Sequence, residues 1–274
     1  MKIVGIVIKQ FEELIQFAKM HYVALLLGPL MGGAFGLIMG GCYILGALDH
    51  NAIIKTPNLP VKSFVQLMIT GDYIVQAEDC KKEEEECETT PQALSISSAS
   101  GVKVSNGRIL TAAHFCERFK QIKGTEGTID SDGDLLKSSY LVAVDHVGMT
   151  HNLEIMLIVQ DVDLCVVKGE TVGGREAQLS SRPPYKTERV WNVAAPHGIY
   201  FPSAPILLEG FYNGKTRHLG NHYSMHAAPG SSGSPIFLSD GTLVGIIHSV
   251  HPTFDVSTYA VPLEDIRQAL EETD

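Results

Sequence analysis

Residues 228–237 read A-P-G-S-S-G-S-P-I-F and hold three serines among glycines and prolines. Gly230, Gly233 and the two prolines disfavour both a helix and the interior of a strand, so the chain requires a specialised turn here. A serine hydroxyl is a weak nucleophile until a histidine accepts its proton, and a buried carboxylate fixes the tautomer of that histidine. The stretch therefore raises the question of where such a histidine and such a carboxylate lie.

Two other segments supply these groups. Residues 109–116, I-L-T-A-A-H-F-C, end an apolar run with small residues and His114, and residues 163–167, D-L-C-V-V, place Asp163 before an apolar run. With G-S-S-G-S-P around Ser232, the order His, Asp, Ser resembles the trypsin-like (chymotrypsin-fold) serine peptidases, including the HtrA-like branch. The resemblance covers roughly residues 91–274, and S-P-I-F-L-S-D-G-T-L-V-G-I-I-H-S-V after the serine extends it.

The resemblance implies a role for each of these residues. His114 would be the general base, Asp163 would orient it, and Ser232 would attack the scissile carbonyl. The amides of Gly230 and Ser232 would form the oxyanion hole. No cofactor is implied, and the substrate would be a protein or peptide.

Alternatives remain at two of these positions. Asp161 is the second candidate for the acid, but the family places its aspartate directly before the apolar run. Ser231 and Ser234 are the alternatives for the nucleophile, and the glycine spacing favours Ser232.

The resemblance also suggests a substrate pocket. His226, six residues before Ser232, would lie at its base, and Val250 would shorten it at one wall. Without a carboxylate there, Arg and Lys side chains are disfavoured, and small aliphatic side chains are expected before the cleaved bond. Acidic or Gln side chains held by His226 or His248 are the alternative.

The expected fold is mostly β. Short runs rich in Val, Ile, Leu, Ser and Thr alternate with turn signals from residue 91 onward. The resemblance implies two six-stranded antiparallel β-barrels and a C-terminal helix, for which 263–272 has the spacing. As a departure from the HtrA type, a regulatory PDZ domain is not expected after the peptidase domain.

Residues 23–48 contain no charged side chain and are long enough for a membrane-spanning helix. We expect an amphipathic segment at 1–22, this transmembrane helix, an acidic juxtamembrane linker at 49–90 and the peptidase domain at 91–274. A cleaved signal peptide is the main alternative for 23–48. The distribution of lysines slightly favours a single-pass protein with an extracytoplasmic peptidase domain.

Glycines recur every four residues within the apolar segment, which would let a second copy of the helix approach closely. They are Gly28, Gly32, Gly36 and Gly40. A homo-oligomer formed through this face is therefore an expectation. A net charge of −10 argues against a nucleic-acid partner.

The five cysteines do not form a recognisable disulfide framework. Cys80 and Cys87 could close a small loop. The family often has a half-cystine directly after its histidine, but Phe115 intervenes before Cys116, so the resemblance leaves the disulfide status of Cys116 open.

No metal site is expected. His218, His222 and His226 have the spacing of ligands on a helix, but their context is β-rich. The alternatives to a membrane-tethered serine endopeptidase are a catalytically idle binding protein of the same fold and a scaffold whose glycine-rich helix is the functional part.

Overall fold

The computed structural model describes residues 57–75, 90–129, 134–169 and 171–274, and Pro57–Asp274 forms one compact unit. The expected transmembrane helix at 23–48, its glycine face and the pair Cys80 and Cys87 lie outside the described residues. Within those ranges, neither of the two α-helices has the length and apolar character needed to cross a bilayer.

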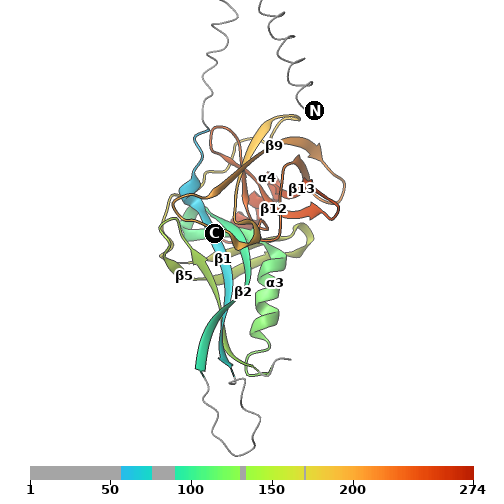
Figure 1. The fold of residues 1–274 in the computed structure, drawn as a ribbon. Helices are drawn as coiled ribbons and strands as arrows, with labels where there is room; N and C mark the ends of the chain where they lie inside the picture. The colour runs from blue at the N-terminus through green and yellow to red at the C-terminus, as the bar shows by residue number, and fades with distance from the viewer. Residues whose placement is uncertain (1–56, 76–89, 130–133, 170) are drawn as a thin grey trace, which may run out of the picture. The chain divides into compact units, whose positions relative to one another are not determined.

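The first half of the unit is a seven-stranded antiparallel sheet with the strand order β5-β4-β1-β2-β3-β7-β6. Its strands are β1 (Phe64–Val75), β2 (Thr90–Lys103), β3 (Arg108–Ala112), β4 (Leu135–Val144), β5 (Thr150–Asn152), β6 (Glu154–Val159) and β7 (Leu164–Lys168). In Figure 1, β1 and β2 run together as a long hairpin.

This arrangement corrects the expectation of two closed six-stranded barrels. The first sheet has seven strands, and its edge strands β5 and β6 are not paired with each other. They are nevertheless consecutive in the chain, because only Leu153 separates them. The Leu153 amide still donates to the Leu141 carbonyl on β4 at 2.9 Å, so the chain leaves the β5 edge of the sheet for the β6 edge directly after this residue.

The folded unit begins at Pro57, well before residue 91, where the β-rich domain was expected to start. Strand β1 lies between β2 and β4 and contributes the fully buried Val65, Leu67 and Ile69 to the core of the sheet. Part of the segment 49–90, which the sequence analysis assigned to a linker, is therefore a central strand. The acidic run that follows β1 separated this strand from the rest of the β-rich sequence and concealed its role.

The second half is a closed six-stranded barrel with the order β10-β13-β12-β11-β8-β9, as expected. Its strands are β8 (Arg189–Ala194), β9 (Ile206–Lys215), β10 (Asn221–Ser224), β11 (Pro235–Phe237), β12 (Leu243–His251) and β13 (Phe254–Pro262). Helix α4 (Leu263–Glu271) follows the barrel and confirms the expected C-terminal helix. Helix α3 (Ala113–Lys123) follows β3 in the first half.

One apolar cluster joins the two halves. Phe64, Leu110 and Leu164 from the first sheet pack in the same cluster as Phe237 and Ile246 from the barrel, and all five are fully buried. Burial of this apolar surface is the main favourable contribution to holding the halves together. The ends of β3, β7 and the loop before β11 are thereby held at the seam between the halves.

Candidate active site

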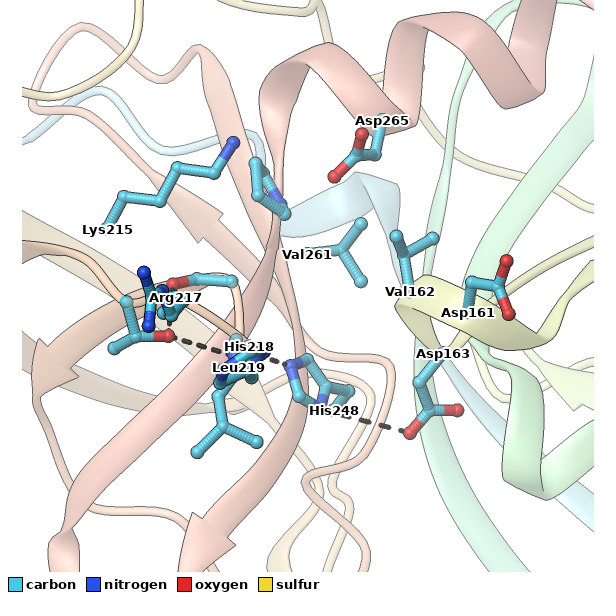
Figure 2. A pocket seen from close by; sticks show the side chains of 13 residues that line it. Asp161, Val162, Asp163, Lys215, Arg217, His218, Leu219, His248, Val261 and Asp265 are labelled. Atoms are coloured by element: carbon cyan, nitrogen blue, oxygen red, sulfur yellow. Dashed lines mark hydrogen bonds and ion pairs between the residues drawn. The ribbon is translucent and has the colours of Figure 1, made fainter.

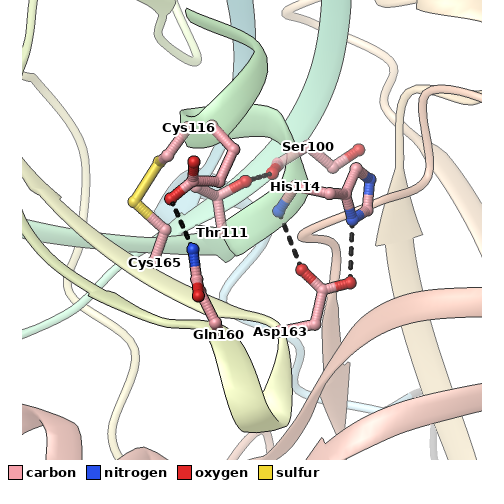
Figure 3. Close-up of a disulfide and its surroundings, with 8 residues drawn as sticks. Ser100, Thr111, His114, Cys116, Gln160, Asp163 and Cys165 are labelled. Carbon is pink, nitrogen blue, oxygen red and sulfur yellow. Dashed lines mark hydrogen bonds and ion pairs between the residues drawn. A yellow bond between two sulfur atoms is a disulfide. The ribbon is translucent and has the colours of Figure 1, made fainter. Parts of the chain in front are cut away.

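Strand pairing brings His114 and Asp163 together although 49 residues separate them. Ala112 at the end of β3 lies opposite Leu164 at the start of β7. His114 follows as the second residue of α3, and Asp163 directly precedes β7 after the turn η4 (Gln160–Val162). The antiparallel register therefore places both residues at the same end of these two paired strands (Figure 3).

Asp163 makes two hydrogen bonds to His114. Its Oδ2 lies 2.8 Å from His114 Nδ1, and its Oδ1 accepts from the His114 amide at 2.8 Å. The residue has a left-handed φ of 56°, which Asp tolerates better than most side chains. Partial burial opposes ionisation, but the hydrogen bonds from His114 and the nearby histidine charges lower the pKa of Asp163 overall.

The second ring nitrogen of His114 reaches the nucleophile candidate. His114 Nε2 lies 2.9 Å from Ser232 Oγ. The other two serines of the motif are buried: Ser231 Oγ accepts from the Ala228 amide, and Ser234 Oγ accepts from Asn192 Nδ2 at 2.9 Å. Of the three serines, Ser232 is the one that the structure brings against His114. The alternative acid Asp161 is exposed and makes no hydrogen bond to His114.

Two glycines give the serine loop its shape. Gly230 has a φ of 94°, and a side chain there would collide with the Ala195 carbonyl. Gly233 has a φ of 84°, and a side chain there would collide with the Ser100 carbonyl and Thr111 Oγ1. Neither the Gly230 amide nor the Ser232 amide has a hydrogen-bond partner among the described residues. Both are therefore available to a carbonyl oxygen of a substrate.

Ser100 on β2 fastens the serine loop to the first sheet. It is fully buried, its amide donates to the Ser232 carbonyl at 2.8 Å, and its Oγ donates to the Gly230 carbonyl at 2.8 Å. The same Oγ accepts from the Ala195 amide at 3.0 Å. One side chain thus connects the first half to two segments of the second half beside Ser232.

Cys116 and Cys165 form a disulfide, which answers a question that the sequence left open. Phe115 does intervene after His114, but helix α3 turns the next residue toward the sheet. Both cysteines are fully buried, and the bond connects α3 to β7 (Figure 3).

His248 lies on the other side of Asp163. Its Nε2 is 3.2 Å from the Leu219 carbonyl and its Nδ1 is 3.9 Å from Asp163 Oδ2. Burial lowers the pKa of His248. The ring also lines a cavity of about 350 Å³ behind Asp163, with Asp161, Arg217 and Asp265 among the other lining residues (Figure 2).

A smaller cavity of about 230 Å³ lies directly beside Ser232. Its lining residues are Ala227, Ala228, Pro229, Ser231, Ser232, Ile247, His248, Ser249 and Val250. Val250 and His248, two of the three residues expected at the substrate pocket, therefore line this cavity. The residues that line the cavity include no carboxylate and no Lys or Arg side chain.

His226 does not line this cavity. Its neighbours Met225 and Ala227 are buried, so the alternation of an extended chain turns His226 outward. The ring is exposed, and its Nδ1 lies 3.4 Å from Asp255 Oδ2. His222 is also apart from His226, since it lies on β10 with Nε2 2.9 Å from Ser257 Oγ. These histidines therefore do not lie along one face of a helix, as their spacing in the sequence would suggest.

The model of the trypsin-like peptidase domain matches residues 99–246, which is more than half of the chain and includes His114, Asp163 and Ser232. The chain belongs to the trypsin-like peptidase family. No curated protein matches its sequence.

Solved structures share the fold of this trypsin-like peptidase at low sequence identity. The active form of the Rv3671c protease from M. tuberculosis has a TM-score of 0.55 and 13% identity, with 83% of this chain and 86% of that chain covered. The serine endoprotease from Yersinia pestis has a TM-score of 0.55 and 15% identity, with 80% and 65% covered. This chain therefore spans about two thirds of the Yersinia chain and most of the M. tuberculosis one.

Two features of this trypsin-like peptidase were not predicted from the sequence. Ser100 carries no motif, and its role depends on contacts with residues that are 95 or more positions away. The partner of Cys116 could not be read from spacing. The one available signal was that Cys116 and Cys165 stand at the same offset from His114 and Asp163.

Proposed function

We propose that the chain is a membrane-tethered serine endopeptidase that uses Ser232, His114 and Asp163. The observation that carries the proposal is the unbroken series of contacts from Asp163 Oδ2 through the His114 ring to Ser232 Oγ, at 2.8 and 2.9 Å. The unpaired amides of Gly230 and Ser232 beside it supply the second requirement of acyl transfer.

The chemistry follows from this arrangement. Ser232 Oγ attacks the scissile carbonyl carbon while His114 Nε2 takes the hydroxyl proton, and the amides of Gly230 and Ser232 donate to the resulting oxyanion. The imidazolium, oriented by Asp163, gives its proton to the leaving amine as the C–N bond breaks. Water then attacks the acyl-enzyme, with His114 again as the base, and the acid product leaves.

The tether is the charge-free segment 23–48. We place the peptidase domain on the extracytoplasmic side, and the disulfide between Cys116 and Cys165 supports an oxidising compartment. Self-association through the glycine face at Gly28 to Gly40 is part of the same proposal. Within the family, the assignment to an HtrA-like branch is our proposal.

We propose a preference for small aliphatic side chains before the cleaved bond. The cavity beside Ser232 is small, and Val250 and Ile247 give it apolar walls. His248 is the polar group at this cavity that could instead hold an acidic or Gln side chain.

Labelling with a fluorophosphonate tests the proposal. A nucleophilic serine should react covalently, and mass spectrometry should locate the label on Ser232. Heat-denatured protein and Ser232→Ala serve as controls. An unlabelled native protein would support a catalytically idle binding protein, and a label on Ser231 or Ser234 would move the nucleophile.

A further inference from the structure

Four large apolar side chains protrude from two adjoining loops of the folded unit. Val147 is 65% exposed, Met149 60%, Ile199 47% and Phe201 61%. The first two belong to the loop between β4 and β5, and the other two follow the turn η5 (Pro196–Gly198). We call these four residues the apolar edge.

The two loops are held against each other. Tyr200 donates through its hydroxyl to the Asp145 carbonyl at 3.1 Å, and a Cβ added at Gly148 would lie 3.5 Å from Pro202 Cγ. The Tyr200 ring also packs on Phe64, with 5.3 Å between the ring centroids. The apolar edge is therefore presented by a supported surface, and its side chains protrude from a fixed base.

The same loops expose no charged side chain of Asp, Glu, Lys or Arg. Residues 145–152 and 196–205 contain a single such residue, Asp145, which is 2% exposed. Its carboxylate is bound by His151 Nε2 at 2.9 Å and by the amides of Val147 and Met149 at 3.0 Å. The one carboxylate of these loops is therefore buried and does not contribute a charge to the surface.

Cationic side chains stand next to this uncharged region. A side chain at Gly174 would collide with the Lys62 carbonyl and come within 3.2 Å of His146 Nδ1, so the chain at Lys62 and at Gly174, next to Arg175, runs beside the loop that carries Val147. Lys62 and Arg175 also line one shared hollow. Both Lys62 and Arg175 are exposed. Protruding apolar side chains with adjacent cations match a lipid headgroup region, where apolar groups insert and basic groups meet anionic phosphates.

The length of the chain agrees with this partner. Eight residues, 49–56, lie between the end of the charge-free segment at 48 and the start of the folded unit at 57. Fully extended, they span at most about 30 Å. A tether of this length would keep Lys62 and the adjoining loops close to the bilayer that holds residues 23–48.

We infer that the apolar edge docks on the lipid surface of the membrane to which the chain is tethered, with Lys62 and Arg175 facing anionic headgroups. This inference rests on the proposed tether. A lipid surface is favoured over a bound peptide because the four side chains protrude, whereas the two cavities at the active site are lined by other residues. Docking would hold the active site at a fixed height above the bilayer, because the Pro229 carbonyl beside the nucleophile accepts from the His197 amide in η5.

Tryptophan fluorescence of the full chain in phosphatidylcholine–phosphatidylserine vesicles tests the inference. In a Trp191→Phe background, Phe201→Trp places the single indole at the apolar edge, and Met149→Trp gives a second reporter on the other loop. Tyr185→Trp is the matched control, because Tyr185 is 66% exposed and precedes β8, at the end of that strand opposite to η5. Lipids brominated in the acyl chains should quench both reporters at least about twofold more than the control.

The outcomes are separable. Flotation of the vesicles reports the tether, and fluorophosphonate labelling reports the integrity of the Ser232 site in every variant. Equal quenching of reporters and control in protein that floats and is labelled would overturn the docking while leaving the tether and the enzyme in place. If Phe201→Cys forms a disulfide cross-link between two copies, and the tryptophan reporters are not quenched, the apolar edge would be assigned to self-association instead. Protein that fails to float would overturn the tether and the docking together.

A further measurement addresses the headgroups. The double variant Lys62→Glu/Arg175→Glu, or vesicles without phosphatidylserine, should reduce the quenching of the Phe201→Trp reporter. Quenching that is unchanged in both conditions would overturn the role of the two cations.

Discussion

Cys116 and Cys165 are bonded to each other, and each lies two residues beyond a residue of the candidate triad, His114 and Asp163 respectively. The disulfide therefore closes a loop that contains Asp163 near one end, and His114 lies two residues before its other end. It joins α3, which carries His114, to β7, which Asp163 directly precedes.

Removing this bond should lower the free energy of unfolding. It should have a smaller effect on the kcat of the protein that remains folded. Closing a loop of about 50 residues stabilises by roughly 2–4 kcal/mol. Cys116→Ala/Cys165→Ala should lower the free energy of unfolding by that order in urea titrations. Reductant should destabilise the parent protein and leave the double variant unchanged; equal sensitivity of both would contradict the assignment.

Ser232→Ala should abolish turnover without unfolding the protein. Triad residues act as a unit, so a loss on the order of 10⁵- to 10⁶-fold in kcat is expected. Ser231→Ala and Ser234→Ala are the matched controls, because their hydroxyls bond within the loop and do not face His114. Peptide hydrolysis and circular dichroism provide the measurements, and activity retained in Ser232→Ala would relocate the nucleophile.

Asp163→Asn should reduce both activity and the pH dependence of stability. The pKa of Asp163 is lowered in the folded protein, so its contribution to stability is present above the ordinary pKa of aspartate, about 3.9, and is lost as the pH falls through the lowered value. Urea midpoints of the variant should therefore fall less steeply than those of the parent below about pH 5. At neutral pH an amide favours the wrong tautomer of His114, and roughly 10⁴-fold of kcat should be lost. Parallel pH curves for the two proteins would contradict the role of this carboxylate.

Ser100→Ala should lower kcat through the position of the serine loop. The Ala195 amide and the Gly230 carbonyl would lose a buried partner, at a cost of about 1–3 kcal/mol each. Small displacements of a catalytic group are expensive, so a loss of roughly 10- to 100-fold in kcat with little change in KM is expected. Ser98→Ala is the control on the same face of β2, because the Ser98 hydroxyl makes no hydrogen bond within the described ranges. Equal effects of both substitutions on kcat would contradict the proposed role of Ser100 in positioning the serine loop.

Val250→Gly should broaden the side chains that are accepted before the cleaved bond. Val250 lines the cavity beside Ser232, so its removal should admit larger apolar residues in a peptide library. His226→Ala should leave the preference unchanged, because His226 points away from that cavity toward Asp255. A preference for Glu or Gln that disappears in His248→Ala would replace the small-aliphatic proposal.

The sequence predicted those parts of the site that depend on short motifs. Ser232 could be selected among three serines from the positions of Gly230 and Gly233 alone, because both glycines respond to local backbone geometry. His226 was misplaced because counting six residues back from Ser232 ignores the side on which an extended chain presents each side chain. Burial of Met225 and Ala227 decides that side, and it depends on the barrel as a whole.

The features that the sequence did not reveal depend on distant contacts. Strand β1 was hidden by the acidic residues that follow it, and its place between β2 and β4 is visible only in the pairing of the sheet. Ser100 and the bond between Cys116 and Cys165 depend in the same way on segments that meet only after folding.

The distribution of the triad over the two halves has a consequence for fragments of this protein. The chain passes once from the first sheet to the barrel, between Lys168 and Arg189, and Tyr185, Lys186 and Thr187 on this passage are exposed. A cut at Lys186 would give one piece with the base and the acid and another with the nucleophile, neither able to hydrolyse a peptide alone. Activity would then depend on reassociation of the pieces through the cluster of Phe64 and Phe237, so its loss on dilution would measure the affinity between the halves.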